Sequence, residues 1–253
     1  MSELRYFACG ETSHDMGRLL RGALRERRVF PAGAFLYRSG TRRVLFDTGY
    51  APEPWRAGLG GWVYRRALPP RVGAGDTIAE QLDPATITHV VLSHLHPDHI
   101  GGVRFFPNAA FVLSDGARRT LERPRLRDGL LRELLPPWFR EATVLPSPAF
   151  SSGPHGLRTA DLFGDGSYLL VDLPGHTRGH LGALIENEVL LAGDAAWGRD
   201  LLGAERRIRP LPRLVSHDMT RQRETAQMLL AAEQHGLRLL FSHDRHPTGQ
   251  NLL

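Results

Sequence analysis

Short apolar runs, each bounded by glycine, proline or aspartate, recur along the chain and alternate with segments that have helical spacing of apolar residues. Runs of this length and content are typical of buried strands. They predict strands at 4–8, 32–38, 43–47, 88–93, 109–114, 167–173, 181–186, 188–193 and 237–242. Because strands and helices alternate, the pattern predicts an α/β protein.

The clearest helical segment is 216–236, where Asp218 is a plausible N-cap and a glycine ends the pattern. Its apolar residues recur at helical intervals: Met219, Ala226, Leu229 and Leu230. Segments 114–122 and 125–135 also predict helices. The stretch 51–75 is rich in proline, glycine and tryptophan, and it predicts an irregular surface loop.

Two strand ends are echoed later in the chain. The run RVLFDTG, with Asp47, resembles EVLLAGDA, with Asp194, and HVVLSH, with His94, resembles LRLLFSH, with His243. The order and the spacing agree in the two halves. We therefore expect two related αβ halves whose strand ends converge on one cleft.

The composition is that of an ordinary globular protein, with 42% hydrophobic and 23% charged residues among 253. No linker interrupts the chain, so one domain over residues 1–253 is predicted. No apolar stretch reaches membrane-span length and the N-terminus lacks the layout of a secretory signal, so we expect a cytoplasmic protein with no membrane partner. The single cysteine, Cys9, excludes an internal disulfide and a cysteine-based zinc site.

The net charge of +5 comes from 32 basic residues that are all arginine. A basic chain invites a nucleic-acid interpretation. The arginines are scattered in short pairs, such as Arg42-Arg43 and Arg118-Arg119, and are not interleaved with aromatic residues. This pattern is more typical of a coding bias than of a binding surface, so no nucleic-acid partner is expected.

Residues 92–101, LSHLHPDHIG, contain three histidines and an aspartate directly after a predicted strand: His94, His96, Asp98 and His99. Residues two apart on an extended chain point to the same side, so His94 and His96 can reach one metal ion. Asp98 and His99 lie beyond a turn and can face a second position. Four ligands do not complete two sites, so further ligands are needed.

Three more polar residues follow predicted strands: His176 in LPGHTRGH, Asp194 in LLAGDAAW and His243 in LLFSHD. We assign one site to His94, His96 and His176, and a second to Asp98, His99 and His243. Asp194 bridges the two. Nitrogen and oxygen ligands suit two zinc ions, although iron(II), manganese or cobalt would also be accepted. Three protein ligands and a bridge leave room for water, which indicates a catalytic site.

The strings SHLHPDHIGG, PGHTRGH, AGDAAW and FSHD, in this order, resemble the metallo-β-lactamase superfamily, whose signature is HxHxDH. LFDTG at 45–49 fits as well, so the resemblance covers nearly the whole chain. It implies an αββα sandwich, in which two mixed β-sheets pack face to face and are flanked by helices. Within the superfamily the chain is most similar to N-acyl-homoserine lactonases. Those enzymes carry a tyrosine three residues after the bridging aspartate, where this chain has Trp197.

These features predict a dinuclear metal-dependent hydrolase that opens a lactone of the N-acyl-homoserine type, or a similar ester, by attack of a metal-bound hydroxide. Asp98 and Trp197 are the predicted catalytic residues. Asp98 would carry a proton to the leaving alkoxide, and the indole N–H of Trp197 can donate a hydrogen bond but cannot titrate. Alternatives are thioesterase or phosphodiesterase chemistry on the same site, an iron-dependent oxidoreductase, and a binding protein that has lost activity.

Two further residues are candidates for support of the metal ligands. Asp47, at a strand end beside His94, is expected to orient a metal-binding imidazole or to cap the turn at Thr48. His180 is expected to hydrogen-bond within its loop. Apolar residues near Trp62 would line a channel for a small-molecule substrate, cover the surface or form a homodimer contact.

Overall fold

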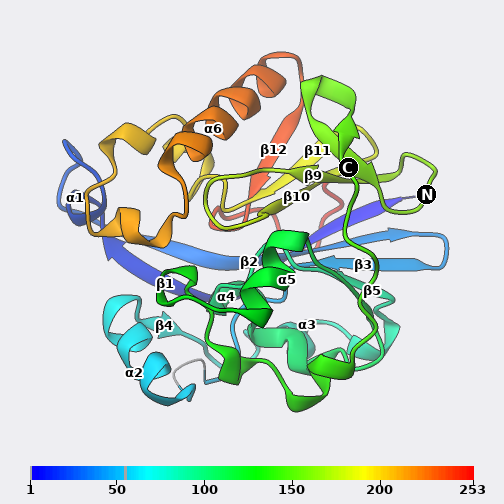
Figure 1. Ribbon diagram of the computed structural model, residues 1–253, viewed down its shortest axis with the longest axis horizontal. Coiled ribbons are helices and arrows are strands. Elements are labelled where there is room, and N and C mark those ends of the chain that lie inside the picture. Colours follow the sequence, from blue (N-terminus) through cyan, green and yellow to red (C-terminus); the bar gives the residue numbers. More distant parts are fainter. Residues whose placement is uncertain (1, 54–55) are drawn as a thin grey trace.

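The computed structural model describes residues 2–53 and 56–253, and these residues form two six-stranded mixed sheets. The first sheet has the order β4-β1-β2-β3-β5-β6 and the second β12-β11-β10-β9-β8-β7 (Figure 1). The strands are β1 (Glu3–Asp15), β2 (Arg27–Ser39), β3 (Arg42–Phe46), β4 (Pro70–Arg71), β5 (His89–Val91), β6 (Ala110–Val112), β7 (Ser151–Ser152), β8 (Arg158–Asp161), β9 (Tyr168–Asp172), β10 (Leu181–Ile185), β11 (Val189–Gly193) and β12 (Arg238–Phe241).

Helices and 3-10 turns connect the strands. The α-helices are α1 (Met16–Leu19), α2 (Gly58–Ala67), α3 (Ile78–Gln81), α4 (Pro97–Ile100), α5 (Asp115–Glu122) and α6 (Met219–Gln234). The 3-10 turns are η1 (Pro84–Thr86), η2 (Gly101–Phe105), η3 (Leu126–Asp128), η4 (Arg132–Leu134), η5 (Pro137–Glu141), η6 (Pro154–Gly156), η7 (Arg199–Leu201), η8 (Glu205–Arg207) and η9 (Pro212–Val215).

The two sheets pack face to face because their strands alternate buried residues between two sides. Along β3, Val44 and Phe46 join a cluster with residues of the second sheet, whereas Leu45 packs on the opposite side. In β9, Leu170 belongs to the same central cluster and Val171 points away from it. Burial on both sides explains why the central strands are apolar throughout.

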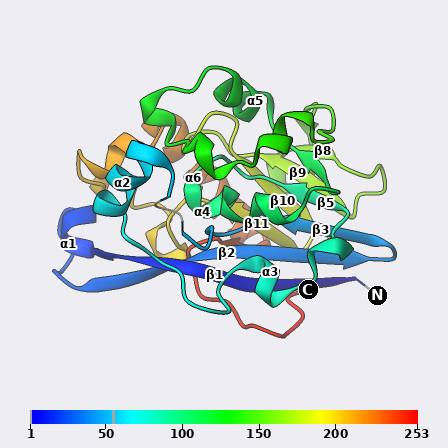
Figure 2. The same cartoon turned by 90° about the horizontal axis from the view of Figure 1, so that it is seen from below.

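Helices cover both outer faces, as the αββα prediction requires. Residues of α3, α4, η2 and α5 pack on the first sheet, and residues of α6 pack on the second. Figure 1 shows α6 on one side of the molecule and α3 and α4 on the other, and Figure 2 shows the long strands β1 and β2 running side by side. The predicted fold class is confirmed.

The two sheets repeat one local topology. An antiparallel pair, β2 with β3, is followed by β5 parallel to β3; in the second sheet β10 pairs antiparallel with β11, and β12 is parallel to β11. Asp47 and His94 follow the first parallel pair, and Asp194 and His243 follow the second. The carboxyl ends of parallel strands lie at one edge of a sheet, so this topology delivers both pairs of polar residues to one place.

Two sequence predictions of local structure are wrong. Part of the stretch 51–75 forms the helix α2 and the short strand β4. In α2 the apolar residues do not gather on one buried face: Leu59, Trp62 and Val63 are 79%, 59% and 52% exposed. The sequence therefore lacks the helical spacing of apolar residues that predicts an amphipathic helix. Residues 54–55, within the predicted loop, lie outside the described residues.

The predicted helix at 125–135 is replaced by the turns η3 and η4. Gly129 between them has φ 66°, a left-handed conformation that ends a right-handed helix. The strands β4, β7 and β8 were not predicted: β4 and β7 have two residues each, and β8 (Arg158–Asp161) begins and ends with a charged residue instead of forming an apolar run. Within the described residues, no helix combines the length and the apolar content needed to cross a bilayer.

Candidate metal centre

The structure brings all seven predicted ligands together at the carboxyl ends of the strands. His94 and His96 follow β5, and the short helix α4 carries Asp98 and His99. The other three lie in loops after β9, β11 and β12: His176, Asp194 and His243. Their donor atoms form three overlapping groups with internal distances within 4.8 Å: His94, His96 and His176; His94, His99 and Asp194; and Asp98, His99 and His243.

The carboxylate of Asp194 lies between the two predicted sites. Its Oδ2 is 3.0 Å from His243 Nε2 and 3.5 Å from His176 Nε2. Its Oδ1 is 3.4 Å from His99 Nε2. One oxygen therefore reaches an imidazole of each site, which is the geometry that a bridging carboxylate needs.

Unpartnered donor atoms show that this centre fits divalent cations. Nε2 of His94, Nε2 of His99 and Oδ1 of Asp194 are buried and have no hydrogen-bond partner among the described residues. Leaving a buried polar atom unpaired costs about 1–3 kcal/mol. Cation binding satisfies all three atoms at once, and a set of imidazoles and carboxylates is the donor set of zinc and related metals.

Hydrogen bonds from the outer nitrogens of three imidazoles aim the inner nitrogens at the centre. His99 Nδ1 lies 2.8 Å from Asp47 Oδ2, and His243 Nδ1 lies 2.7 Å from the carbonyl oxygen of Pro31. His94 Nδ1 lies 2.9 Å from Ser93 Oγ. With the proton on Nδ1 in the first two cases, Nε2 keeps its lone pair for a metal.

A family model described as the metallo-beta-lactamase superfamily matches residues 27–235, which is most of the chain. The chain belongs to the metallo-beta-lactamase superfamily.

A probable metallo-hydrolase of Mycobacterium tuberculosis (strain H37Rv) is 32% identical over 187 residues, which cover 65% of this chain and 56% of that protein. This chain thus spans little more than half of that relative. The N-acyl homoserine lactonase AttM of Agrobacterium fabrum is 27% identical over 231 residues, which cover 85% of this chain and 82% of AttM.

Solved structures of other hydrolases share the fold. An N-acyl homoserine lactone hydrolase with the product N-hexanoyl-L-homoserine bound at its catalytic metal centre superposes with a TM-score of 0.69 at 17% identity, over 96% of this chain and 93% of that chain. A probable metal-dependent hydrolase from Staphylococcus aureus gives a TM-score of 0.72 at 16% identity, over 98% and 91%. At these identities the likeness concerns the fold.

The Asp47 carboxylate forms three hydrogen bonds beside the candidate metal centre, more than its position in the sequence indicated. It accepts hydrogen bonds from the Ser93 backbone N–H at 2.8 Å and from Ser93 Oγ at 2.7 Å, besides the contact with His99. Asp47 is fully buried and has φ 59°, a left-handed conformation that aspartate adopts more readily than most residues. It touches His99 directly and reaches His94 only through Ser93.

His180 supports the backbone of the predicted bridging residue. Its Nε2 accepts a hydrogen bond from the backbone N–H of Asp194 at 3.0 Å. Burial lowers the pKa of His180 to about 4, so the ring is neutral and can accept this bond at neutral pH. The ring also lies 2.8 Å from where a Cβ on Gly193 would stand, which explains a glycine before the aspartate.

The histidine pKa values follow the contacts with carboxylates. Burial lowers the pKa of His94 well below its usual value. Burial acts in the same direction at His243, but the charge of Asp194, the hydrogen bond with Asp194 and the charge of Asp98 together outweigh it and raise the pKa to about 9. The carboxylates near His99 likewise raise its pKa well above the usual value. A centre that attracts protons in this way also attracts divalent cations.

Two phenols lie beside the centre: Tyr50, which the sequence did not single out, and Tyr64, which was expected only as part of the channel or surface segment near Trp62. The hydroxyl groups of Tyr50 and Tyr64 lie 2.9 Å apart. Burial raises both pKa values well above the usual value, and the nearby Asp98 carboxylate raises them further, so both groups stay protonated. Tyr64 belongs to α2, and no spacing in the sequence links that helix to the metal ligands.

Trp197 packs, partly buried, against a small apolar cluster that includes Met16, Leu20 and Phe30. A hydrogen bond from its N–H to a substrate stays a prediction. The alternative that the indole only packs the pocket wall stays a prediction as well.

Proposed function

We propose that this protein is a metal-dependent hydrolase that opens a lactone or a similar carboxylic ester at a dinuclear centre. The shared position of the Asp194 carboxylate between two groups of imidazoles carries the proposal. The N-acyl homoserine lactonases among its relatives support the substrate class, since AttM matches over 85% of this chain.

The predicted ligands would hold two divalent cations, most favourably zinc. Such cations supply Lewis acidity toward a carbonyl oxygen and lower the pKa of bound water toward about 7. The chain holds the ligands rigidly through the contacts of Asp47, Ser93 and the Pro31 carbonyl. Rigid ligands keep the donor atoms in place without reorganisation during the reaction.

Asp98 is the carboxylate best placed to move a proton. Its side chain is 13% exposed, against 4% for Asp194, so substrate and solvent can reach it. Its two oxygens lie 3.9 Å from His99 Nε2 and 3.7 Å from His243 Nε2, the other two residues of the predicted second site. In the proposed reaction Asp98 takes a proton from the attacking water and delivers it to the leaving alkoxide.

A substrate panel tests this function. Zinc-loaded protein is assayed with N-acyl-homoserine lactones of several chain lengths, a thioester and bis-p-nitrophenyl phosphate, and its metal content is measured by elemental analysis. We expect lactone turnover with two zinc ions per chain, and a loss of about 10²–10⁴-fold in kcat for Asp98→Asn. The exposed Asp83→Asn is the matched control.

Three outcomes would contradict the proposal. Turnover of the phosphodiester with untouched lactones would favour a phosphodiesterase, and preferential thioester cleavage would favour a thioesterase. A single iron per chain without hydrolytic activity would favour an oxidoreductase.

A further inference from the structure

Two arginines line a cavity beside two of the predicted ligands and the groove next to it. A narrow cavity of about 10 Å³ touches His94 and His176, and a wider groove of about 560 Å³ lies outside it. Both are lined by Arg127 of η3 and by Arg178 of the loop after β9. The cavity has about the volume of one water molecule. Because the cavity and the groove share Arg127 and Arg178, a substrate that approached His94 and His176 from the groove would contact these two side chains.

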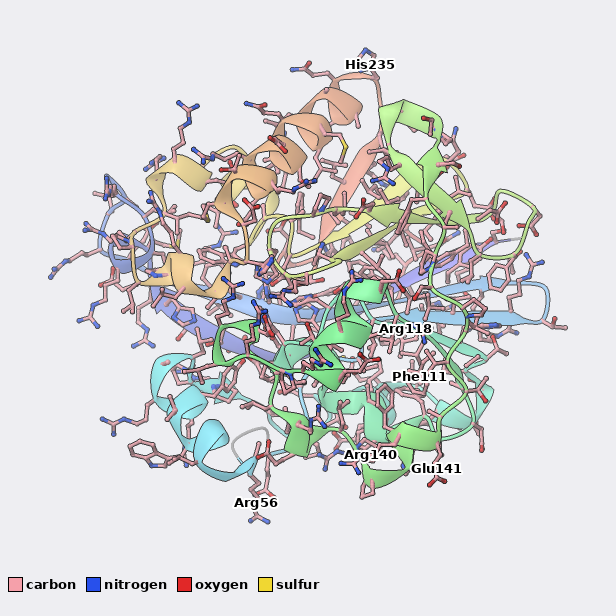
Figure 3. All side chains as sticks on the ribbon, viewed as in Figure 1. Arg56, Phe111, Arg118, Arg140, Glu141 and His235 are labelled. Atoms are coloured by element: carbon pink, nitrogen blue, oxygen red, sulfur yellow. The ribbon has the colours of Figure 1, made fainter. Side chains whose placement is uncertain are left out.

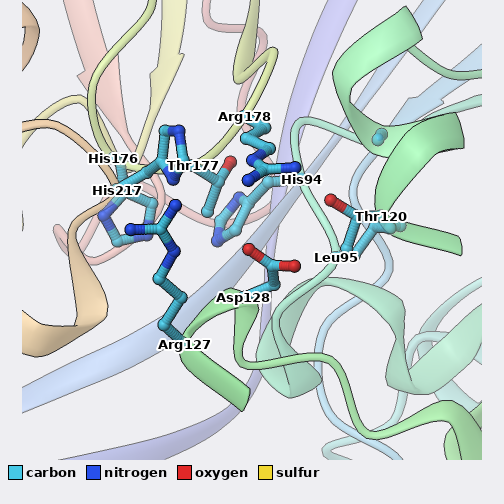
Figure 4. A pocket seen from close by; sticks show the side chains of 10 residues that line it. His94, Leu95, Thr120, Arg127, Asp128, His176, Thr177, Arg178 and His217 are labelled. Atoms are coloured by element: carbon cyan, nitrogen blue, oxygen red, sulfur yellow. The ribbon is translucent and has the colours of Figure 1, made fainter. Parts of the chain in front are cut away.

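Figure 4 shows both guanidinium groups directed into this space, with the carboxylate of Asp128 on the other side. Within the described part of the chain, neither guanidinium forms a hydrogen bond or an ion pair. Asp128 Oδ2 instead accepts the backbone N–H of Arg125 at 2.8 Å. The two guanidinium groups that line the cavity and the groove therefore have hydrogen-bond donors available for a ligand.

The carboxylates of the outer groove are largely engaged elsewhere. The charged residues that line it are Arg119, Arg127, Arg178, Arg221, Asp115, Asp172 and Asp218. Asp172 pairs with Arg158 at 3.1 Å, and Asp218 caps α6 by accepting the backbone N–H groups of Thr220 and Arg221. Four arginines and three aspartates line the groove, so its lining has an excess of one positive charge.

We propose that Arg127 and Arg178 bind a carboxylate or phosphate group of the substrate, so that the enzyme acts on lactones or esters that carry an oxyanion. This inference rests on the proposed function and narrows its substrate class. A guanidinium offers paired N–H donors whose geometry matches a carboxylate or a phosphate. A site for a neutral acyl chain would be lined mainly by apolar side chains, whereas the exposed apolar residues of α2 line neither the cavity nor the groove.

Kinetics with a matched pair of substrates test the proposal. The pair is a γ-butyrolactone with a ring carboxylate and its methyl amide, and a phosphonate analogue shows which oxyanion is preferred. We expect kcat/KM to favour the anionic lactone by about tenfold, mainly through KM, because charge-assisted hydrogen bonds are worth about that factor. The double variant Arg127→Gln/Arg178→Gln should lose this preference. Arg140→Gln, an exposed arginine at the edge of the molecule (Figure 3), should keep it.

Calorimetric titration gives a readout that does not need turnover. Glutarate and its monoamide differ in one carboxylate, and we expect glutarate to bind about tenfold more tightly to the wild type and the Arg140→Gln protein, but not to the double variant. Equal binding of the two ligands, or a preference that survives in the double variant, would overturn the arginine site. Failure to hydrolyse any lactone or ester would contradict the proposed function alone, and the titration would then decide whether the arginines bind an oxyanion.

Discussion

Single atoms carry much of the chemistry of this protein. The difference between a histidine that binds metal and one that packs is a matter of which nitrogen has a partner. Nδ1 of His99 forms a hydrogen bond with Asp47, and its Nε2 is buried without a partner. In His180, by contrast, Nε2 accepts a hydrogen bond from the backbone N–H of Asp194. The first arrangement is typical of a metal ligand and the second of a positioning residue.

Asp47→Asn tests this distinction at the residue scale. An amide of the same shape removes the charge that orients His99 and offers an N–H where an acceptor is needed, so we expect zinc affinity and kcat to fall about 10–100-fold. Zinc affinity is measured by competition with a chromophoric chelator, with the exposed Asp83→Asn as control. Unchanged affinity would show that Asp47 only shapes the turn.

Short elements, rather than long helices, position the ligands. The four-residue helix α4 sits against the loop after β3, where Thr48 N and Oγ1 donate to the carbonyl of His99 at 2.9 and 2.7 Å. Gly101, which follows the helix, allows the close approach: a Cβ there would stand 2.0 Å from Ala51 N and 2.4 Å from the Tyr50 carbonyl carbon. Gly102 is required for the same steric reason, since a Cβ there would stand 2.5 Å from the Thr48 carbonyl oxygen.

Gly101→Ala is the corresponding test at the element scale. The added methyl meets backbone atoms that cannot rotate away, so we expect a loss of about 1–3 kcal/mol in the free energy of unfolding, together with weaker zinc binding. Denaturant unfolding measures the first effect. Gly73→Ala is the matched control, because its Cβ would meet only Asp76 Oδ2 at 3.4 Å. Equal stability of the two variants would mean that α4 shifts freely on the sheet.

The whole molecule creates the centre by joining its two sheets. The first sheet delivers His94, His96, Asp98 and His99, and the second delivers His176, Asp194 and His243. A hydrogen bond from Leu181 N to the Ser93 carbonyl, at 2.9 Å, ties the sheets together beside the ligands. Cation binding therefore links elements from both halves of the chain.

Metal removal tests this link at the scale of the molecule. Cations that bind only the folded state stabilise it by about 2.7 kcal/mol at a hundredfold excess over Kd, which corresponds to a rise of roughly 5–10 °C in Tm for a domain of this size. Scanning calorimetry after treatment with a chelator should show that loss, and zinc should reverse it. Calcium should not, because it prefers oxygen ligands. A Tm that is insensitive to the chelator would argue against a metal that joins the sheets.

The central strands, α5, α6 and the seven predicted ligands could be read from the sequence alone, because each leaves a local trace: an apolar run, helical spacing, histidines packed around one turn, or a polar residue soon after a predicted strand. It missed α2 and misread 125–135, where exposed apolar residues and a left-handed Gly129 break the local pattern. The packing of the two sheets was needed to show that Asp47 contacts His99, that the Asp98 carboxylate acts on Tyr64, and that Arg127 and Arg178 line one groove. Those contacts join residues more than ten positions apart, and they depend on how two sheets pack, which no stretch of sequence records.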